Sequence, residues 1–374
     1  MEEQYQSQTQ QLQLQTRRRQ QTESQVTLSD VNAVGRNIVK FSIIGMVAFI
    51  VLRMMLTSFV AYWKATHPEP PPAPSMGFGK LTQIDFPLEI IRPDELQLEL
   101  PNNTLPSFGD RAKVFFMPFS SPSLLADEQA KSKAAKYGFT SQPQIVDNYQ
   151  YRWFKKEPLD MTLEMDIRNF NFTLESDYLA QTELLLGSQL PDDYSAVQMV
   201  KSFLSRSNSL PADVATNSGQ ITYLKSLGGE LLEAVSLSDA DLIQVDLDRY
   251  PIDDQYEFYT PKGDEGIISA LVTGAYGKDV SVVEMRNSYQ HLDYSQIETY
   301  PLWSVKEAWE ALKDGDGYVA QGQELETAII REITLGYYDE FAEQQYMQPI
   351  FVFRGDDDFL AFIPALDPSV FAKD

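Results

Sequence analysis

The chain of 374 residues contains no cysteine and only two histidines, His67 and His291. Without thiols the protein can form no disulfide, no cysteine-ligated zinc site and no cysteine nucleophile. Cations are also few, because 30 Lys and Arg stand against 54 Asp and Glu, for a net charge of −24. Since phosphate contacts need clustered cations, we expect no nucleic-acid partner.

Long apolar side chains are almost missing from residues 1–25, a Gln-rich segment in which only Leu12 and Leu14 follow Met1. Such a segment cannot bury enough surface to offset its conformational entropy. We therefore predict a disordered tail over residues 1–40. A coiled-coil or partner-docking helix is the alternative, because Gln-rich tracts can also form helices.

One long apolar run, residues 41–63, contains a single charged residue, Arg53. At about 1.5 Å per residue, a helix of this length crosses a hydrocarbon core of about 30 Å with some tilt. The run is apolar all round, which is not typical of a helix at the edge of a soluble core. No small-residue cleavage site follows it, which disfavours a signal peptide. The run therefore predicts one transmembrane helix.

The charges on the two sides of this run differ in sign. Residues 1–64 hold 7 Lys and Arg against 4 Asp and Glu, for +3, whereas residues 65–374 hold 23 against 50, for −27. Because cations flank membrane helices on the cytoplasmic side, we predict a cytoplasmic N-terminus and an extracytoplasmic C-terminal part at the cell membrane. Five prolines within residues 68–74 predict an extended stalk over residues 64–79.

The rest of the chain alternates helix signals with strand patterns. Capping residues and apolar stripes predict helices, and a period of two predicts strands. The predicted helices are 124–137, 193–205 and 305–314. The predicted strands are 113–117, 149–154, 161–167, 170–174, 242–248, 257–260, 266–274, 280–285, 328–337, 348–354 and 359–365. Short turns join many of these strands, so we expect an α+β fold of two related units, 80–210 and 211–374, each a helix followed by an antiparallel meander.

The stretch TYPLWSVKEAWEALKDGDGYV, residues 299–319, resembles the C-terminal part of the YycH/YycI group. These proteins are membrane-anchored extracytoplasmic regulators of a cell-wall sensor kinase in Gram-positive bacteria. The stretch LGYYDEFAEQQYMQPIFVFRGDDDF, residues 335–359, and FGKL at residues 78–81 resemble uncharacterised single-pass membrane proteins of candidate-phylum bacteria. The resemblance implies one N-terminal span, helix-plus-meander units and a regulatory role without catalytic residues.

Acidic residues are the remaining candidates for chemistry. Calcium is the natural metal for an acidic, cysteine-free exported protein, and its candidate ligands are Asp314, Asp316, Asp356 and Asp358. Both clusters also fit ordinary turns, where Asp and Gly are favoured. His291 lies near Asp293 without a nucleophile motif, so we interpret the pair as a solvated turn.

Carboxylate positions decide whether acid–base catalysis is plausible. Along residues 242–248, Ile243 and Val245 alternate with Asp246 and Asp248, which predicts that both carboxylates face solvent. No buried carboxyl group with a tuned pKa therefore stands out. An exported hydrolase needs only two carboxylates, however, so a carboxylate-dependent hydrolase of the cell envelope stays an alternative function.

Two arginines stand out by their place. Arg53 near the middle of the span costs at least about 2.5 kcal/mol on insertion, which indicates either snorkelling or a polar partner on another membrane helix. Arg331 shares an alternating face with Ile333 and Leu335, which predicts a buried structural ion pair.

The sequence thus favours a non-enzymatic, membrane-anchored interaction or regulatory module. We expect no cofactor, and a protein partner that contacts Arg53 in the membrane, the acidic surface or a sheet edge. A self-assembling structural component of the envelope is a further alternative.

Overall fold

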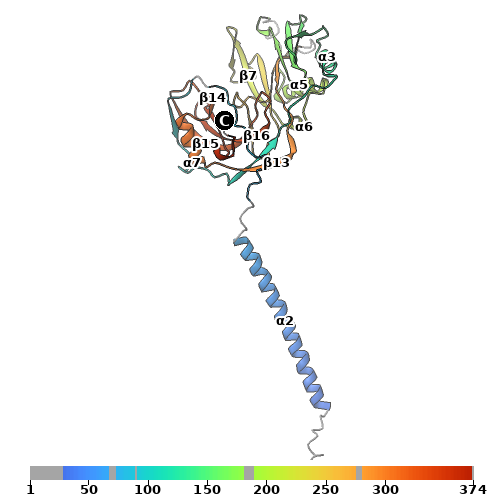
Figure 1. Cartoon of the computed structure of the whole chain (residues 1–374), viewed down its shortest axis with the longest axis vertical. Coiled ribbons are helices and arrows are strands. Elements are labelled where there is room, and N and C mark those ends of the chain that lie inside the picture. The colour runs from blue at the N-terminus through green and yellow to red at the C-terminus, as the bar shows by residue number, and fades with distance from the viewer. Residues whose placement is uncertain (1–27, 67–72, 89–90, 181–188, 275–279, 373–374) are drawn as a thin grey trace, which may run out of the picture. The chain divides into compact units, whose positions relative to one another are not determined.

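The computed structural model describes residues 28–66, 73–88, 91–180, 189–274 and 280–372. The chain divides into two compact units between residues 73 and 74 (Figure 1). The described part of the N-terminal unit is the helix α2 (Leu28–Thr66). Its segment Val39–Trp63 has exposed side chains and is long and apolar enough to cross a membrane.

The helix begins earlier than predicted. Residues 28–40, which we assigned to a disordered tail, are the first turns of α2. Val31, Val34 and Ile38 recur at helical spacing in the sequence there, and this pattern extends the helix toward the N-terminus from the apolar run. The Gln-rich segment and residues 67–72 of the predicted stalk lie outside the described residues.

The end of the predicted stalk belongs to the folded C-terminal unit. The backbone N–H of Ser75 donates to Thr299 Oγ1 at 3.0 Å, and that of Met76 donates to the Thr299 carbonyl at 3.1 Å. The hydroxyl of Tyr300 donates to the Gly79 carbonyl at 3.0 Å. These bonds hold residues 75–79 against the folded unit, so they are not a free spacer.

The C-terminal unit is a mixed α+β structure, mostly sheet with few helices. Its first sheet has nine strands, all paired antiparallel, in the order β3-β4-β5-β6-β12-β11-β9-β7-β8. The strands are β3 (Gln144–Ile145), β4 (Gln150–Lys155), β5 (Met161–Asp166), β6 (Phe172–Ser176), β7 (Gln220–Leu227), β8 (Glu230–Glu233), β9 (Leu242–Leu247), β11 (Ile268–Val272) and β12 (Val282–Asn287).

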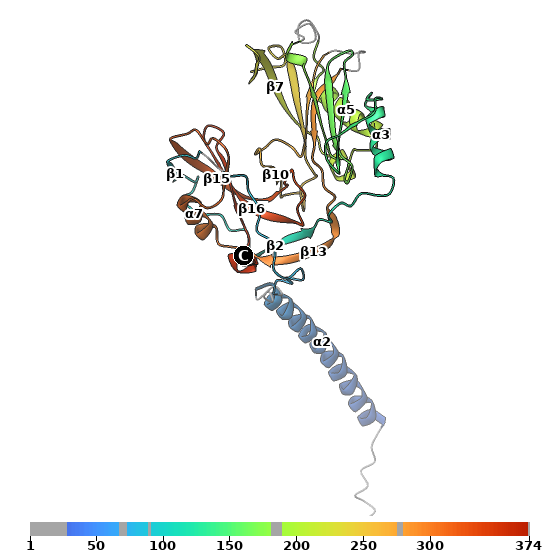
Figure 2. The ribbon, with the colours of Figure 1, turned by 45° about the horizontal axis from the view of Figure 1, so that its top comes forward.

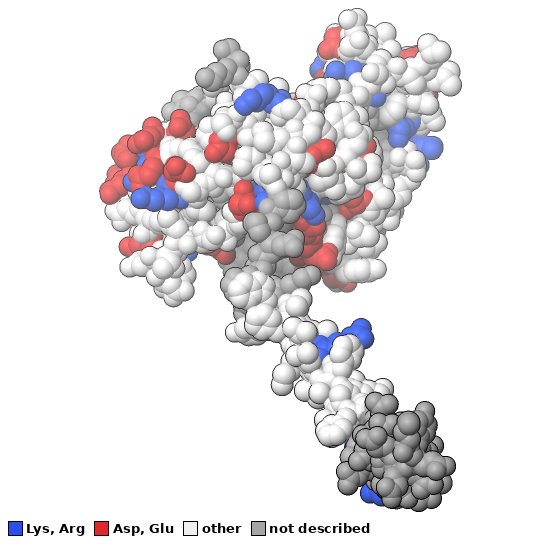
Figure 3. Space-filling model, turned by 60° about the horizontal axis from the view of Figure 1, so that its bottom comes forward, with Lys and Arg blue, Asp and Glu red and all other residues white. Residues whose placement is uncertain are grey.

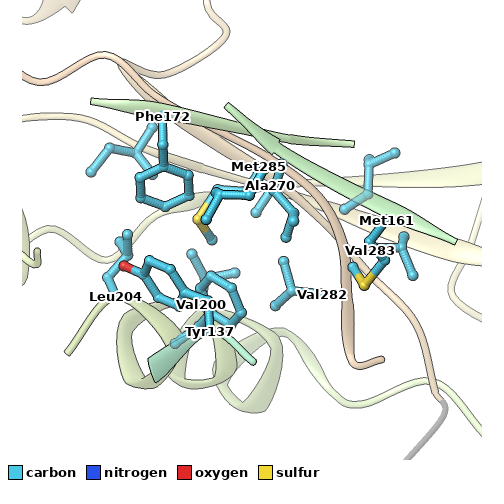
Figure 4. Packing of buried hydrophobic residues seen from close by; sticks show 14 of the residues in the cluster. Tyr137, Met161, Phe172, Val200, Leu204, Ala270, Val282, Val283 and Met285 are labelled. Atoms are coloured by element: carbon cyan, nitrogen blue, oxygen red, sulfur yellow. The ribbon is translucent and has the colours of Figure 1, made fainter. Parts of the chain in front are cut away.

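Helices α3 (Ala126–Lys136) and α5 (Asp193–Arg206) lie on the same side of this sheet (Figure 2), and α6 (Ala212–Ala215) and η1 (Tyr178–Ala180) add single turns. In the core beneath them, Tyr137 and Leu204 point from the helical side toward Phe172 and Met285 of the strands (Figure 4). The rings of Tyr137 and Phe172 lie 5.1 Å apart. One face of the sheet is therefore apolar and covered, as the period of two predicts.

The second sheet has eight strands. Its main path is β1-β15-β16-β17-β14, and β2 pairs with both β13 and β16. Strands β1 and β10 each run parallel to β15, and the other pairs are antiparallel. The strands are β1 (Glu95–Leu98), β2 (Arg111–Phe116), β10 (Phe258–Tyr259), β13 (Asp293–Pro301), β14 (Tyr318–Gln321), β15 (Thr327–Tyr338), β16 (Tyr346–Gly355) and β17 (Leu360–Pro364), with α7 (Val305–Asp314) and η2 (Pro368–Val370).

The two sheets are not two successive halves of the chain. The eight-stranded sheet takes strands from both ends of the folded unit and β10 from its middle, whereas the nine-stranded sheet takes residues 144–287. The boundary expected between residues 210 and 211 lies inside the nine-stranded sheet, because β6 pairs with β12. Both α3 and α5 contribute to the core of that one sheet, so the predicted repeat of two related units is not confirmed.

Local signals placed the helices well. Ser304 caps α7, because its Oγ accepts from the Glu307 N–H at 3.2 Å and contacts the Glu307 carboxylate at 2.5 Å. Gly315 ends the helix at a φ of +103°, where a side chain would be strained. Asp192 caps α5 through the Ser195 N–H at 2.7 Å. Strands β1, β3, β7, β8, β13 and β14 were not predicted. Most of their side chains are at least partly exposed, except in β14, so they lack a clear buried face.

Arg331 is exposed, so the predicted burial of its ion pair is wrong. It bonds to Asp356 at 2.6 Å and to Glu99 at 2.5 Å at the surface. The pairing of β15 with β16 shifts between Ile330 and Glu332. Such a bulge changes which face the following side chains occupy, so an alternation counted straight through Arg331 puts it on the wrong side.

Candidate functional site

The two sheets meet at Arg249, a fully buried side chain just after β9. Its Nε donates to Asp339 Oδ2 at 2.7 Å, and Asp339 follows β15 in the other sheet. Its Nη1 donates to Asp213 Oδ2 at 2.9 Å and its Nη2 to the Gln290 carbonyl at 2.6 Å. Burial lowers the pKa of Arg249, but Asp339 more than offsets this and raises it overall. The charged guanidinium therefore joins the two sheets.

Residues 339–345 connect β15 with β16, and we call them the junction loop. Two more arginines of the nine-stranded sheet region contact this loop. The guanidinium of Arg286 lies 3.8 Å from the ring centre of Phe341. Arg168 lies 3.6 Å from the carboxylate of Glu343. The loop between β15 and β16 is thus fixed to the neighbouring sheet by cations.

A polar cavity of about 810 Å³ lies beside the junction loop, on the face of the nine-stranded sheet that carries no helix core. Its lining includes Glu164, Asp166, Arg168, Asn287 and Glu343. Asp166 binds Arg168 at 2.5 Å, and Glu164 binds the guanidinium of a neighbouring strand, Arg152, at 2.8 Å. Because these carboxylates are paired with arginines, they are held in place as hydrogen-bond acceptors.

An acidic cavity of about 750 Å³ adjoins the polar cavity. The two share Phe119, Ala342 and Glu343, so we treat them together as the junction groove. The acidic cavity is lined by residues 82–88, by Phe119, by the junction loop and by the adjacent ends of β15 and β16. Its volume is in the range of small-ligand and side-chain pockets.

Buried polar groups line the acidic cavity. Among the described residues, Gln348 Oε1 is buried there without a hydrogen-bond partner, and the buried hydroxyl of Tyr338 lies near the Glu340 carboxylate. An unsatisfied buried polar group costs about 1–3 kcal/mol, so Gln348 Oε1 is an acceptor that a ligand or water can satisfy.

The carboxylates of β9 correct the expectation that they face solvent. Asp246 and Asp248 are both buried, because the backbone at Gly266 and Ile267 lies over them. The Ile267 N–H donates to Asp248 at 3.1 Å, and the Gly266 N–H donates to Asp246 at 3.2 Å. Burial raises the pKa of Asp248 to about 7, and the nearby Asp339 carboxylate raises it further while the Ile267 bond opposes the shift. Tuned carboxyl groups are therefore present, although neither of these two lines the described cavities.

The predicted site residues are not brought together. Asp356 is bound to Arg331, and Asp314 ends α7. Within the described residues, no group of three His, Asp or Glu side chains has the geometry of a metal site. His291 is exposed beside Asp293, whose pKa falls to about 2 chiefly through the hydroxyl and N–H of Ser295. Arg53 is exposed on α2.

The acidic side chains spread over the surface of the folded unit. Figure 3 shows Asp and Glu side chains at several places on one face of the folded unit, with Lys and Arg side chains among them. The groove residues gave no sequence signal of their own, because they come from six separate segments of the chain. The one available hint was the run of alternating polar residues on β5, which marks the uncovered face of that sheet.

No protein-family model and no curated protein matches this chain. Among solved structures, the chain is similar to an uncharacterised protein from Eubacterium rectale at 10% sequence identity. The similarity covers 69% of this chain and 84% of that one, with a TM-score of 0.32.

Proposed function

We propose that this protein is a membrane-anchored interaction or regulatory module without catalytic activity, and that its folded unit binds a protein partner in the junction groove. The observation that carries the proposal is the buried, unpartnered acceptor Gln348 Oε1, which lies beside the buried Tyr338 hydroxyl in a groove formed by two adjoining cavities. A groove with fixed acceptors and open polar groups is suited to recognition.

The arrangement of carboxyl groups favours binding over hydrolysis. A glycosidase-type site needs two carboxyl groups facing one substrate bond, one of them with a raised pKa. Asp248 has the raised pKa but lies under the backbone of residues 266–267. In the polar cavity, Asp166 and Glu343 share one arginine, Arg168, which holds both carboxyl groups in structural contacts.

The membrane part of the proposal is supported by charge. The helix α2 has an apolar segment, and cations precede it far more often than they follow it. We propose that the N-terminus is cytoplasmic and the folded unit extracytoplasmic. A folded unit with a charge near −27 would also be repelled by anionic lipid, which leaves its groove available to a partner.

The absence of cysteine allows a direct test, because any introduced cysteine is unique. Gln83→Cys lies exposed in the groove lining, and Glu230→Cys lies exposed at the far edge strand β8. Each variant is labelled on intact cells with a membrane-impermeant maleimide that carries a photo-crosslinker. We expect labelling at both positions, and a discrete crosslinked protein only from Gln83→Cys. No labelling would refute the topology, and equal crosslinking from both positions would refute the groove.

Arg53 supplies a separate test of a partner within the membrane. Arg53→Leu should leave insertion intact and abolish co-purification of a membrane partner, whereas Arg53→Lys should retain it, because only the first removes the charge. Unchanged co-purification with Arg53→Leu would mean that Arg53 only snorkels.

A further inference from the structure

The charged side chains that line the acidic cavity all carry carboxyl groups. Its lining contains the carboxylates of Asp85, Glu340 and Glu343, and among the described residues it contains no Lys or Arg. Glu343 is partly engaged by Arg168 at 3.6 Å and by the Ser120 N–H at 3.0 Å. The Phe341 N–H donates to Glu340 at 2.8 Å. Burial raises the pKa of Glu340, and hydrogen bonds from the Phe341 N–H, the Tyr338 hydroxyl and the Ala342 N–H oppose the shift.

Two buried polar side chains within this cavity, one with an unpartnered acceptor, point to a ligand. Tyr338 is 1% exposed and Gln348 is 4% exposed, and both line the cavity. The amide of Gln348 is oriented by its Nε2, which donates to the Thr82 carbonyl at 2.9 Å and leaves Oε1 as a free acceptor. The hydroxyl of Tyr338 lies near the Glu340 carboxylate, and burial followed by this carboxylate raises the pKa of Tyr338. Both side chains are more than nine-tenths buried, so an unsatisfied acceptor on Gln348 is costly.

Aromatic rings form the walls. Phe86 packs edge-on against Tyr338 at 4.9 Å between ring centres, and Tyr346 and Phe119 complete the lining. Phe119 is 58% exposed, although it is large and apolar. Aromatic faces combined with carboxylates and free acceptors attract cations, because the ring quadrupole and the acceptors act on the same charge.

We propose that the acidic cavity binds a basic side chain, arginine or lysine, presented by an extended segment of the protein partner. Such a group supplies only donors, five from a guanidinium and three from an ammonium, and so matches a lining that supplies acceptors. The adjoining polar cavity gives the flanking peptide room to continue along the groove. The proposal rests on the proposed function, because the ligand is taken to be part of a partner.

The test uses the full chain in nanodiscs of zwitterionic lipid, so that lipid charge does not compete. The probe is a labelled peptide, Gly-Ser-Arg-Ser-Gly, compared with the same peptide in which citrulline replaces arginine. Citrulline has nearly the same shape but no charge. We expect the arginine peptide to bind at least about tenfold more tightly in fluorescence anisotropy, with a preference that shrinks as salt is added.

Three variants locate the binding. Glu340→Gln removes the charge but keeps an acceptor for the Phe341 N–H, and should weaken the arginine peptide by about tenfold. Tyr338→Phe removes only the hydroxyl and should weaken it by about threefold. Glu230→Gln makes the same change of net charge on the remote strand β8 and should have no effect. Unfolding in urea shows whether each variant is folded.

The proposal is overturned if the arginine and citrulline peptides bind equally or not at all, or if Glu340→Gln and Glu230→Gln behave alike. Crosslinking from Gln83→Cys separates this result from the wider function. A crosslinked partner with no arginine preference would leave the interaction module intact and reject the cation site. Arginine-selective binding without a crosslinked partner would support the cation site and reject the proposed binding of a protein partner in the groove.

Discussion

Removal of the Arg249 guanidinium should destabilise the folded unit more than any surface ion pair. Arg249→Met keeps much of the length of the side chain but leaves Asp339, which is 1% exposed, without its cation. Breaking a buried ion pair by removing one partner costs about 3–5 kcal/mol, because the remaining charge is buried without compensation. The carbonyl of Gln290 also loses its donor at 2.6 Å, so we expect the upper part of this range.

The assay is urea unfolding of the full chain in a neutral detergent, followed by tryptophan fluorescence. Trp153 reports on the nine-stranded sheet, and Trp309 reports on the eight-stranded sheet. The matched control is Arg152→Met, because Arg152 pairs with Glu164 at 2.8 Å with both side chains about one-third exposed. This control should cost less than about 1 kcal/mol.

A double variant checks the physical cause. Arg249→Met combined with Asp339→Asn removes the stranded charge, so it should be more stable than Arg249→Met alone. The reasoning is refuted if Arg249→Met costs no more than Arg152→Met. It is also refuted if the double variant gains nothing over the single one.

Three further predictions follow from local geometry. Asp248 binds its proton more tightly in the folded state, where its pKa is about 7, than in the unfolded state, where it is 3.8. The free energy of unfolding should therefore fall as pH rises from about 4 to about 7, by up to about 1.4 kcal/mol per pH unit. Urea midpoints across that range should show the slope, and Asp248→Asn should flatten it. Ser304→Ala should cost about 1 kcal/mol by removing the cap of α7, and Ser304→Asp should cost less, as measured by the same urea titration. Arg331→Leu should cost less than about 1 kcal/mol, and the loss should shrink in high salt, because its ion pairs are exposed; a loss of several kcal/mol would show that the pair is effectively buried.

The sequence by itself determined the features whose cause is local. The apolar run of α2 follows from composition, and α7 follows from its cap, stripe and terminal glycine at neighbouring positions. The period of two on β5 correctly indicated one covered face. These features could be predicted because the residues that cause them lie within one or two turns of each other in the chain.

Only the tertiary structure decided the rest. The bulge at Arg331 depends on how β16 pairs with β15, and a shift of one residue reverses the faces of a strand. Asp248 is buried by the distant backbone at Ile267. The junction groove combines residues 82–88 with residues 338–348, and the polar atoms of Tyr338 and Gln348 become significant only once burial removes them from water. Long-range pairing and burial are properties of the assembled chain, so no local pattern in the sequence could indicate them.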